Sequence, residues 1–177
     1  SLYHLIGLDR IQGVNYPVIV DLIEKTIERL EKEMSSYDSY PFGGPILAMD
    51  ASGLGAPIKD FLKDRHVLNQ RGRQLFPVVF TGGEAARFDP ATRNYNISKS
   101  LIISNFLSLM QHHRFDYAPN LQALPLLEQE ISNFKYHLTP SGHTGFDAQS
   151  GFHDDLICAI CVPLVIAEWR FAKRLRR

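Results

Sequence analysis

The sequence feature that most constrains the fold is a short apolar run that ends in an acid and a glycine-rich turn. Residues 45–49 are apolar, Asp50 follows them, and two glycines lie within residues 51–57, ahead of a short helical pattern. A continuous apolar run of this length indicates a strand buried on both faces. In α/β sheets the carboxyl ends of such strands carry the ligand and catalytic groups. Asp50 is therefore a candidate functional residue.

Strand-like and helical segments alternate along the 177 residues, which are enough for one α/β domain with a full core. We expect an α/β layered sheet flanked by helices. Residues 85–96 are polar and are expected to form a mobile loop, and residues 139–152 a long loop rich in Gly and His. The expected strands are 2–11, 46–50, 75–80, 114–118 and 135–138, and the expected helices are 15–34, 56–63, 98–111, 121–134 and 153–173.

Two of these helices have clear start signals. Asn15 is expected to cap the first helix, with Pro17 in its first turn, and Ser98 is expected to cap the third. The first helix has a regular apolar stripe. In the third, the residues expected to face the core are Leu101, Ile102, Phe106, Leu107 and Met110.

A second group of acids opens the last helix, which is otherwise apolar. His153, Asp154 and Asp155 precede a run of apolar residues that extends to residue 167. Acids at a helix N-terminus are favoured by the helix dipole and can cap it, which is one interpretation of the pair. The other interpretation is that Asp50 and this pair, from distant parts of the chain, share a divalent metal.

Cys158 and Cys161 are the only cysteines, and both lie inside the apolar run of the last helix. Residues three apart are neighbours on a helix, so the pair is expected to be small core residues rather than a redox or zinc site. No signal peptide and no apolar span of 18 residues is found, which favours a reducing cytoplasm and no membrane contact.

The formal net charge is zero, so the chain has no global attraction to nucleic acid and any such affinity must come from local patches. A basic tail is one such patch, although cations at the end of a helix also favour its dipole. Its members are Arg170, Lys173, Arg174, Arg176 and Arg177.

Several motifs follow one another in a fixed order across almost the whole chain. They occupy residues 13–17, 48–55, 80–84, 97–99, 127–131 and 153–155, with the sequences GVNYP, AMDASGLG, FTGGE, ISK, LEQEI and HDD. Together they resemble the C-terminal nuclease domain of the large subunit of phage terminases. The resemblance implies a ribonuclease H-like mixed β-sheet flanked by helices, and a cluster of acids that binds two divalent metals, Mg²⁺ or Mn²⁺.

The resemblance also implies a function and a set of partners. The activity would be endonucleolytic cutting of concatemeric viral DNA during genome packaging, in the host cytoplasm. The partners would be double-stranded DNA, the portal protein, the terminase small subunit and an ATPase domain upstream in the same chain. Since no GxxxxGK[ST] loop occurs, ATP hydrolysis is not expected in these 177 residues.

The matching positions give the expected site. Asp50, Asp155 and Asp154 would be catalytic metal residues. Neighbours on a helix point about 100° apart, so one of the pair is expected to be a direct ligand, and Asp155 is favoured. His153 and Lys99 are candidates for supporting roles, although a His at a helix start is also a common cap and Lys99 suits an exposed first turn. Lys99, Arg87 and Arg93 are the candidate DNA contacts.

One part of the family pattern is not found. The family has a first acid on a strand that should precede residues 2–11, and the sequence contains no match for it. Asp9 looks like such an acid, but its spacing from the first helix fits the family's second strand. We therefore expect a fragment of a longer chain, a single nuclease domain over residues 1–177 with little activity by itself.

Two other functions stay open at this point. A Holliday-junction resolvase or a transposase-like nuclease would share the acids but act on branched DNA or on strand ends. A catalytically silent module that docks DNA or the portal would fit the missing acid.

Overall fold

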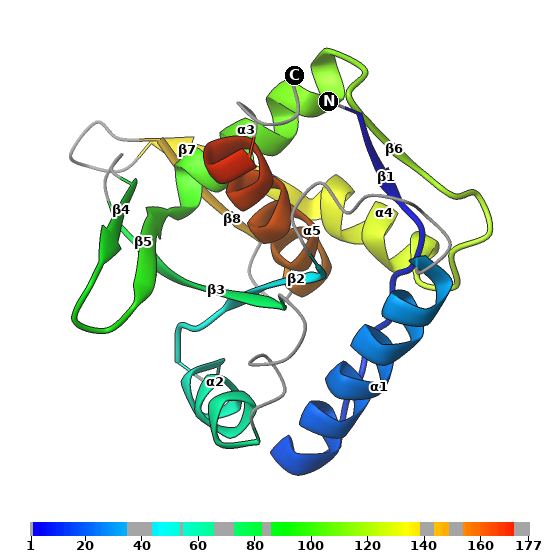
Figure 1. The fold of residues 1–177 in the computed structure, drawn as a ribbon. Coiled ribbons are helices and arrows are strands. Elements are labelled where there is room, and N and C mark those ends of the chain that lie inside the picture. Colours follow the sequence, from blue (N-terminus) through cyan, green and yellow to red (C-terminus); the bar gives the residue numbers. More distant parts are fainter. Residues whose placement is uncertain are drawn as a thin grey trace.

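Among the described residues, the central sheet has four strands in the order β2-β3-β5-β4 (Figure 1). In the computed structural model the described residues are 2–34, 44–53, 55–65, 73–82, 86–138, 144–148 and 154–171. Strands β2 (Ile46–Asp50), β3 (Gln74–Thr81) and β5 (Asn94–Ser98) are parallel, and β4 (Ala86–Asp89) is antiparallel to β5. The sheet is therefore mixed, as expected.

Helices cover both faces of this sheet, and the side chains of β2 contact a core on each face. Its side chains alternate between faces, as in any strand. Ile46 and Ala48 pack against the larger core, which α3 (Lys99–Gln111) and α5 (Asp155–Ile166) line. Leu47 and Met49 pack against the smaller core, between α1 (Tyr16–Met34) and α2 (Gly55–Asp64).

The remaining elements surround the larger core. Helix α4 (Leu124–Asn133) packs against α5, which continues into a five-residue π-helix, η1 (Ala167–Phe171). Strands β1 (Tyr3–Leu5) and β6 (Phe115–Tyr117) form a parallel pair, and β7 (Phe134–Leu138) forms an antiparallel pair with β8 (Thr144–Ala148). Among the described residues, no helix has the length and apolar character needed to cross a membrane.

The two predicted helix caps are confirmed. The Asn15 side-chain oxygen accepts a hydrogen bond from the Val18 N–H at 3.3 Å, and the Ser98 hydroxyl accepts one from the Leu101 N–H at 3.2 Å. These bonds satisfy N–H groups that have no partner within the helix. The position of Ser98 at the end of β5 therefore fixes where α3 begins.

Several expectations about individual elements are wrong. Residues 86–98 form the β4–β5 hairpin rather than a mobile loop, and the expected loop over residues 139–152 contains β8. The first strand spans only Tyr3–Leu5. In α3, Ile102 and Phe106 are buried as expected, but Leu101, Leu107 and Met110 are exposed, and Ile103 and Leu109 are buried in their place.

Candidate functional site

Asp50 lies at the carboxyl end of β2, where the chain leaves the sheet in a tight turn. Its Oδ1 accepts a hydrogen bond from the Ser52 N–H at 2.8 Å, and the Ser52 hydroxyl accepts one from the Phe80 N–H at 2.9 Å. Gly53 has a φ of 47°, which favours glycine, and a Cβ at Gly55 would overlap the Asp50 carbonyl. The turn holds the exposed Asp50 carboxylate in place.

The N-terminus of α5 is capped by a side chain from another helix. Asp154 occupies the N-cap position but makes no side-chain cap bond. The Glu130 Oε2 instead accepts hydrogen bonds from the N–H groups of Leu156, at 2.9 Å, and Ile157, at 3.1 Å. The simple cap interpretation of the Asp154-Asp155 pair is therefore wrong for Asp154, whose carboxylate is left for other partners.

Each acid of the pair faces a cation. The Lys99 Nζ donates to Asp154 Oδ2 at 2.6 Å, in a partly buried pair. The Arg10 Nη2 lies 3.4 Å from Asp155 Oδ2, and the Asp155 side chain is 69% exposed. The two neighbouring acids therefore have different partners.

Asp50 ends β2, the strand against which α5 packs. The alternation of β2 puts Asp50 on the same face as Ile46 and Ala48, which is the face that α5 covers. Burial raises the pKa of the Cys158 thiol to about 12, and the carboxylates of Asp154, Asp50 and Asp155 all add to that rise. The three acids thus act on one thiol from the same end of the domain, and the prediction that Asp50 and Asp155 share a metal stays a prediction.

The donor set suits a hard cation. Carboxylate oxygens are preferred by Mg²⁺, whereas Cys158 is buried and its raised pKa keeps it protonated, so it is no thiolate ligand. Both cysteines are core residues, as predicted. Within the described ranges, no group of three or more His, Cys, Asp or Glu side chains lies close enough together to hold a metal ion.

Glu130 and Arg10 are the site residues that the sequence did not reveal. The Glu130 side chain is 6% exposed, burial raises its pKa, and its Oε1 lies 3.7 Å from Arg10 Nη1 without a hydrogen bond. Arg10 thus bridges Glu130 and Asp155. The LEQEI motif was a signal for Glu130, but nothing local marked it as the cap of a distant helix.

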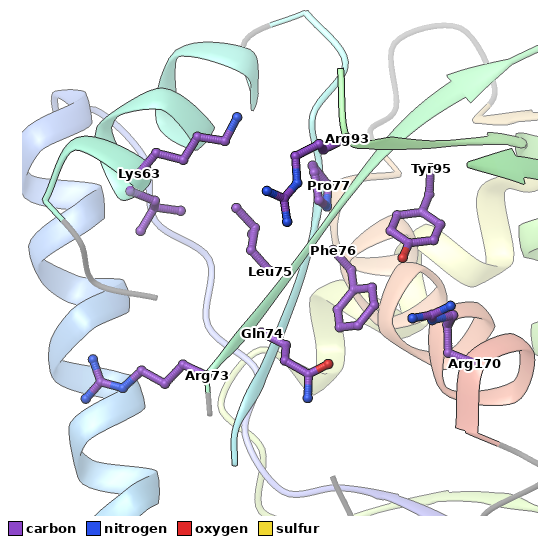
Figure 2. A pocket seen from close by; sticks show the side chains of 10 residues that line it. Lys63, Arg73, Gln74, Leu75, Phe76, Pro77, Arg93, Tyr95 and Arg170 are labelled. Carbon is purple, nitrogen blue, oxygen red and sulfur yellow. The ribbon is translucent and has the colours of Figure 1, made fainter. Parts of the chain in front are cut away.

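The candidate DNA contacts lie on separate elements. Lys99 is beside Asp154, Arg87 is exposed on the edge strand β4, and Arg93 lines a pocket at the amino ends of β3 and β5 (Figure 2). His153 and the tail beyond residue 171 lie outside the described residues. Asp9 is exposed after β1, which pairs with β6 and not with β2.

No protein-family model matches this sequence, and no curated protein matches it. Solved structures do match the fold. The large terminase nuclease from thermophilic phage G20c, determined with bound cobalt and with bound magnesium, has a TM-score of 0.50, 18% sequence identity and 89% coverage of this chain. The Thermus phage P74-26 large terminase nuclease domain has a TM-score of 0.51, 17% identity and 91% coverage.

This chain has the fold of phage large terminase nuclease domains. The mixed sheet flanked by helices is the ribonuclease H-like arrangement that the motifs implied. The chain spans 65% of the G20c nuclease and 64% of the P74-26 domain, so less than two thirds of either structure is matched.

Proposed function

We propose that this chain is the divalent-metal-dependent endonuclease domain of a phage large terminase, which cuts concatemeric viral DNA during genome packaging. The observation that carries the proposal is that Asp50 ends β2, the strand against which α5 packs, and that Asp154 and Asp155 lie at the start of α5. The fold likeness to terminase nucleases, one of them solved with bound magnesium, supports the same conclusion.

Asp50 and Asp155 would hold Mg²⁺ or Mn²⁺, with Asp154 as a further ligand. When bound, such ions lower the pKa of a coordinated water and neutralise charge on the attacked phosphate. Arg10 orients the Asp155 carboxylate, and Glu130 fixes the first turn of α5. Lys99 offers its ammonium group to a phosphate beside Asp154. His153 is proposed to support the site, and Arg87 and Arg93 to contact DNA.

The partners proposed with this activity are double-stranded DNA, the portal protein, the small subunit and an ATPase domain in the same chain. The place of action would be the host cytoplasm. Each of these depends on the nuclease assignment and would be tested after it.

Plasmid nicking tests the proposal. Supercoiled DNA would be incubated with the full-length protein, and separately with residues 1–177, in Mg²⁺, in Mn²⁺ and in EDTA. We expect metal-dependent nicking by the full-length protein, little by the shorter chain, and none in Asp50→Asn or Asp155→Asn. Asp116→Asn is the matched control, because Asp116 is an exposed acid on β6, outside the central sheet.

Nicking by the Asp50→Asn and Asp155→Asn proteins at the normal rate would contradict the site. A folded full-length protein that binds DNA but nicks it under no condition would favour the silent docking module. A strong preference for four-way junctions over linear duplex would favour the resolvase alternative.

A further inference from the structure

A cavity of about 430 Å³ lies at the amino ends of β3 and β5 (Figure 2). Helix α2 contributes Lys63 to its lining, the β4–β5 turn contributes Arg93, and η1 contributes Arg170. The acids lie elsewhere, because Asp50 ends β2 and Asp154 precedes α5 beside the start of α3. The cavity is therefore separate from the proposed nuclease site.

Among the described residues that line this cavity, the charged ones are all basic. Arg73, also in the lining, is held by Glu31 at 2.7 and 2.6 Å, and that contact raises the pKa of Arg73. Figure 2 shows its side chain turned away toward α1. Among the residues that the structure describes, no carboxylate pairs with Lys63, Arg93 or Arg170. Three cations are thus left for an outside anion.

Arg93 has an unusual backbone conformation for an arginine. Its φ is 56°, in the left-handed region that costs a residue with a side chain about 1 kcal/mol. The turn before it is fixed by Asp89, which accepts hydrogen bonds from the Ala91 N–H at 2.9 Å and the Thr92 hydroxyl at 2.8 Å. Glycine would be unstrained here, so the arginine side chain is present in spite of a local cost.

Arg170 also projects from an unusual backbone, the π-helix that ends α5, and such segments are frequent at functional sites. The lining also includes the rings of Phe76 and Tyr95. The Tyr95 ring lies 5.5 Å from that of Phe76 and contacts that of Trp169 edge-on at 5.7 Å. These packed aromatic rings fix the shape of that part of the cavity.

We propose that this cavity is a phosphate-binding site, which takes phosphate groups of a nucleotide or of a nucleic-acid backbone. Guanidinium groups form paired hydrogen bonds with phosphate oxygens, and a lysine adds a compact charge. Arg93 and Arg170 supply the first kind of contact and Lys63 the second. The site requires no metal. Arg93 is also one of the proposed DNA contacts, so duplex binding at this site rests on the proposed function, whereas pyrophosphate binding does not.

The test is calorimetric titration of the chain with inorganic pyrophosphate, and with a 12-base-pair duplex, at low salt in EDTA. Arg93→Gly removes the guanidinium and also relieves the left-handed strain. We expect it to weaken pyrophosphate or duplex binding roughly tenfold without lowering the unfolding temperature. Arg170→Met, which keeps much of the side-chain length, should have an effect of similar size.

His113→Gly is the matched control, because His113 has nearly the same φ, 53°, at the exposed end of α3. It should relieve strain equally and leave binding unchanged. If Arg93→Gly and Arg170→Met lose affinity for pyrophosphate alone, the ligand is of the nucleotide type. If they lose affinity for the duplex, the ligand is a nucleic-acid backbone. Wild-type protein that binds neither probe, or Arg93→Gly and Arg170→Met proteins that bind both normally, would overturn the proposal.

Discussion

The two ends of the parallel strands differ in charge and in how that charge is held. At the carboxyl end, Asp50 and Asp154 are placed by a tight turn and by a capped helix. At the amino end, Arg93 and Arg170 project from backbone conformations that are rare for their residue type. We therefore propose different ligands for the two ends, a metal cation at the carboxyl end and phosphate at the amino end.

The largest expected effect separates the two ends by function. Asp50→Asn should reduce metal-dependent nicking by at least about a hundredfold, because even the outer partners of metal ligands cost ten- to a hundredfold. The same variant should bind pyrophosphate with normal affinity. Arg93→Gly should weaken pyrophosphate binding and reduce nicking much less than Asp50→Asn does. Nicking gels and calorimetry on both variants make the comparison. Parallel losses in both assays would mean that the ends are one site.

The next effect concerns the support of the carboxyl end. Glu130→Ala should lower the free energy of unfolding by about 3 kcal/mol, because two N–H groups of α5 and the Arg10 charge lose their partner. Urea unfolding measures it. Glu128→Ala, on the exposed part of the same helix, should change stability by less than about 0.5 kcal/mol. Equal effects would show that Glu130 is not the cap.

Glu130, which is buried, and Glu168, which is partly buried, should change the free energy of unfolding with pH in opposite directions. Burial raises the pKa of Glu130, so its contribution to stability is full at low pH and is lost as the pH rises through the folded pKa. Burial also raises the pKa of Glu168, but hydrogen bonds from Arg114 and Tyr3 outweigh it and lower the pKa overall. The Glu168 contribution is therefore present above the unfolded pKa and is lost as the pH falls through the folded one.

Unfolding curves of Glu130→Gln and Glu168→Gln between about pH 3 and pH 7 test these signs. Relative to wild type, Glu130→Gln should gain stability as the pH rises, and Glu168→Gln should lose it. If the stability difference from wild type changed with pH in the same direction for both variants, the expected pKa shift of one of the two carboxylates would be wrong.

The smallest effect concerns Lys99. Because its ammonium group neutralises Asp154, Lys99→Met should raise the affinity for Mn²⁺ by several-fold, about 1 kcal/mol. Calorimetric titration with MnCl₂ measures it, and Lys63→Met at the amino end is the control that should change nothing. An affinity that falls in Lys99→Met would mean that the ammonium group holds Asp154 in the metal-binding position.

The sequence was a good guide wherever one element determined its own structure. The expected stripe of α1 included Val20, Ile23, Ile27 and Leu30; Val20 and Ile27 are buried, and Ile23 and Leu30 are partly buried. In α3, which is apolar on most sides, the stripe gave no unique face, and the tertiary packing selected Ile103 and Leu109. Strands β4 and β5 were both missed, because residues 86–98 carry many polar and charged side chains and a short edge strand is defined by its partner.

The same division holds for the candidate site. Asp50 and the Asp154-Asp155 pair were visible because acids at the end of an apolar strand and at the start of an apolar helix stand out. Glu130 and Arg10 act through contacts across 26 and 145 residues of sequence, which no local pattern encodes. Arg93 was expected in a mobile loop, and the β4–β5 hairpin carries it to a pocket at the amino end of the strands.

The most direct test of the separation between the ends is amide NMR of the 177-residue chain during titration with Mn²⁺, which broadens signals from residues near it. We expect the first signals to broaden at Ala51, Ser52 and residues 155–158, while those of Arg93, Tyr95 and Arg170 keep their intensity. Asp50→Asn should remove the selective broadening. Broadening that begins at the amino end, or that is uniform over the chain, would contradict a metal site formed by Asp50 and the start of α5.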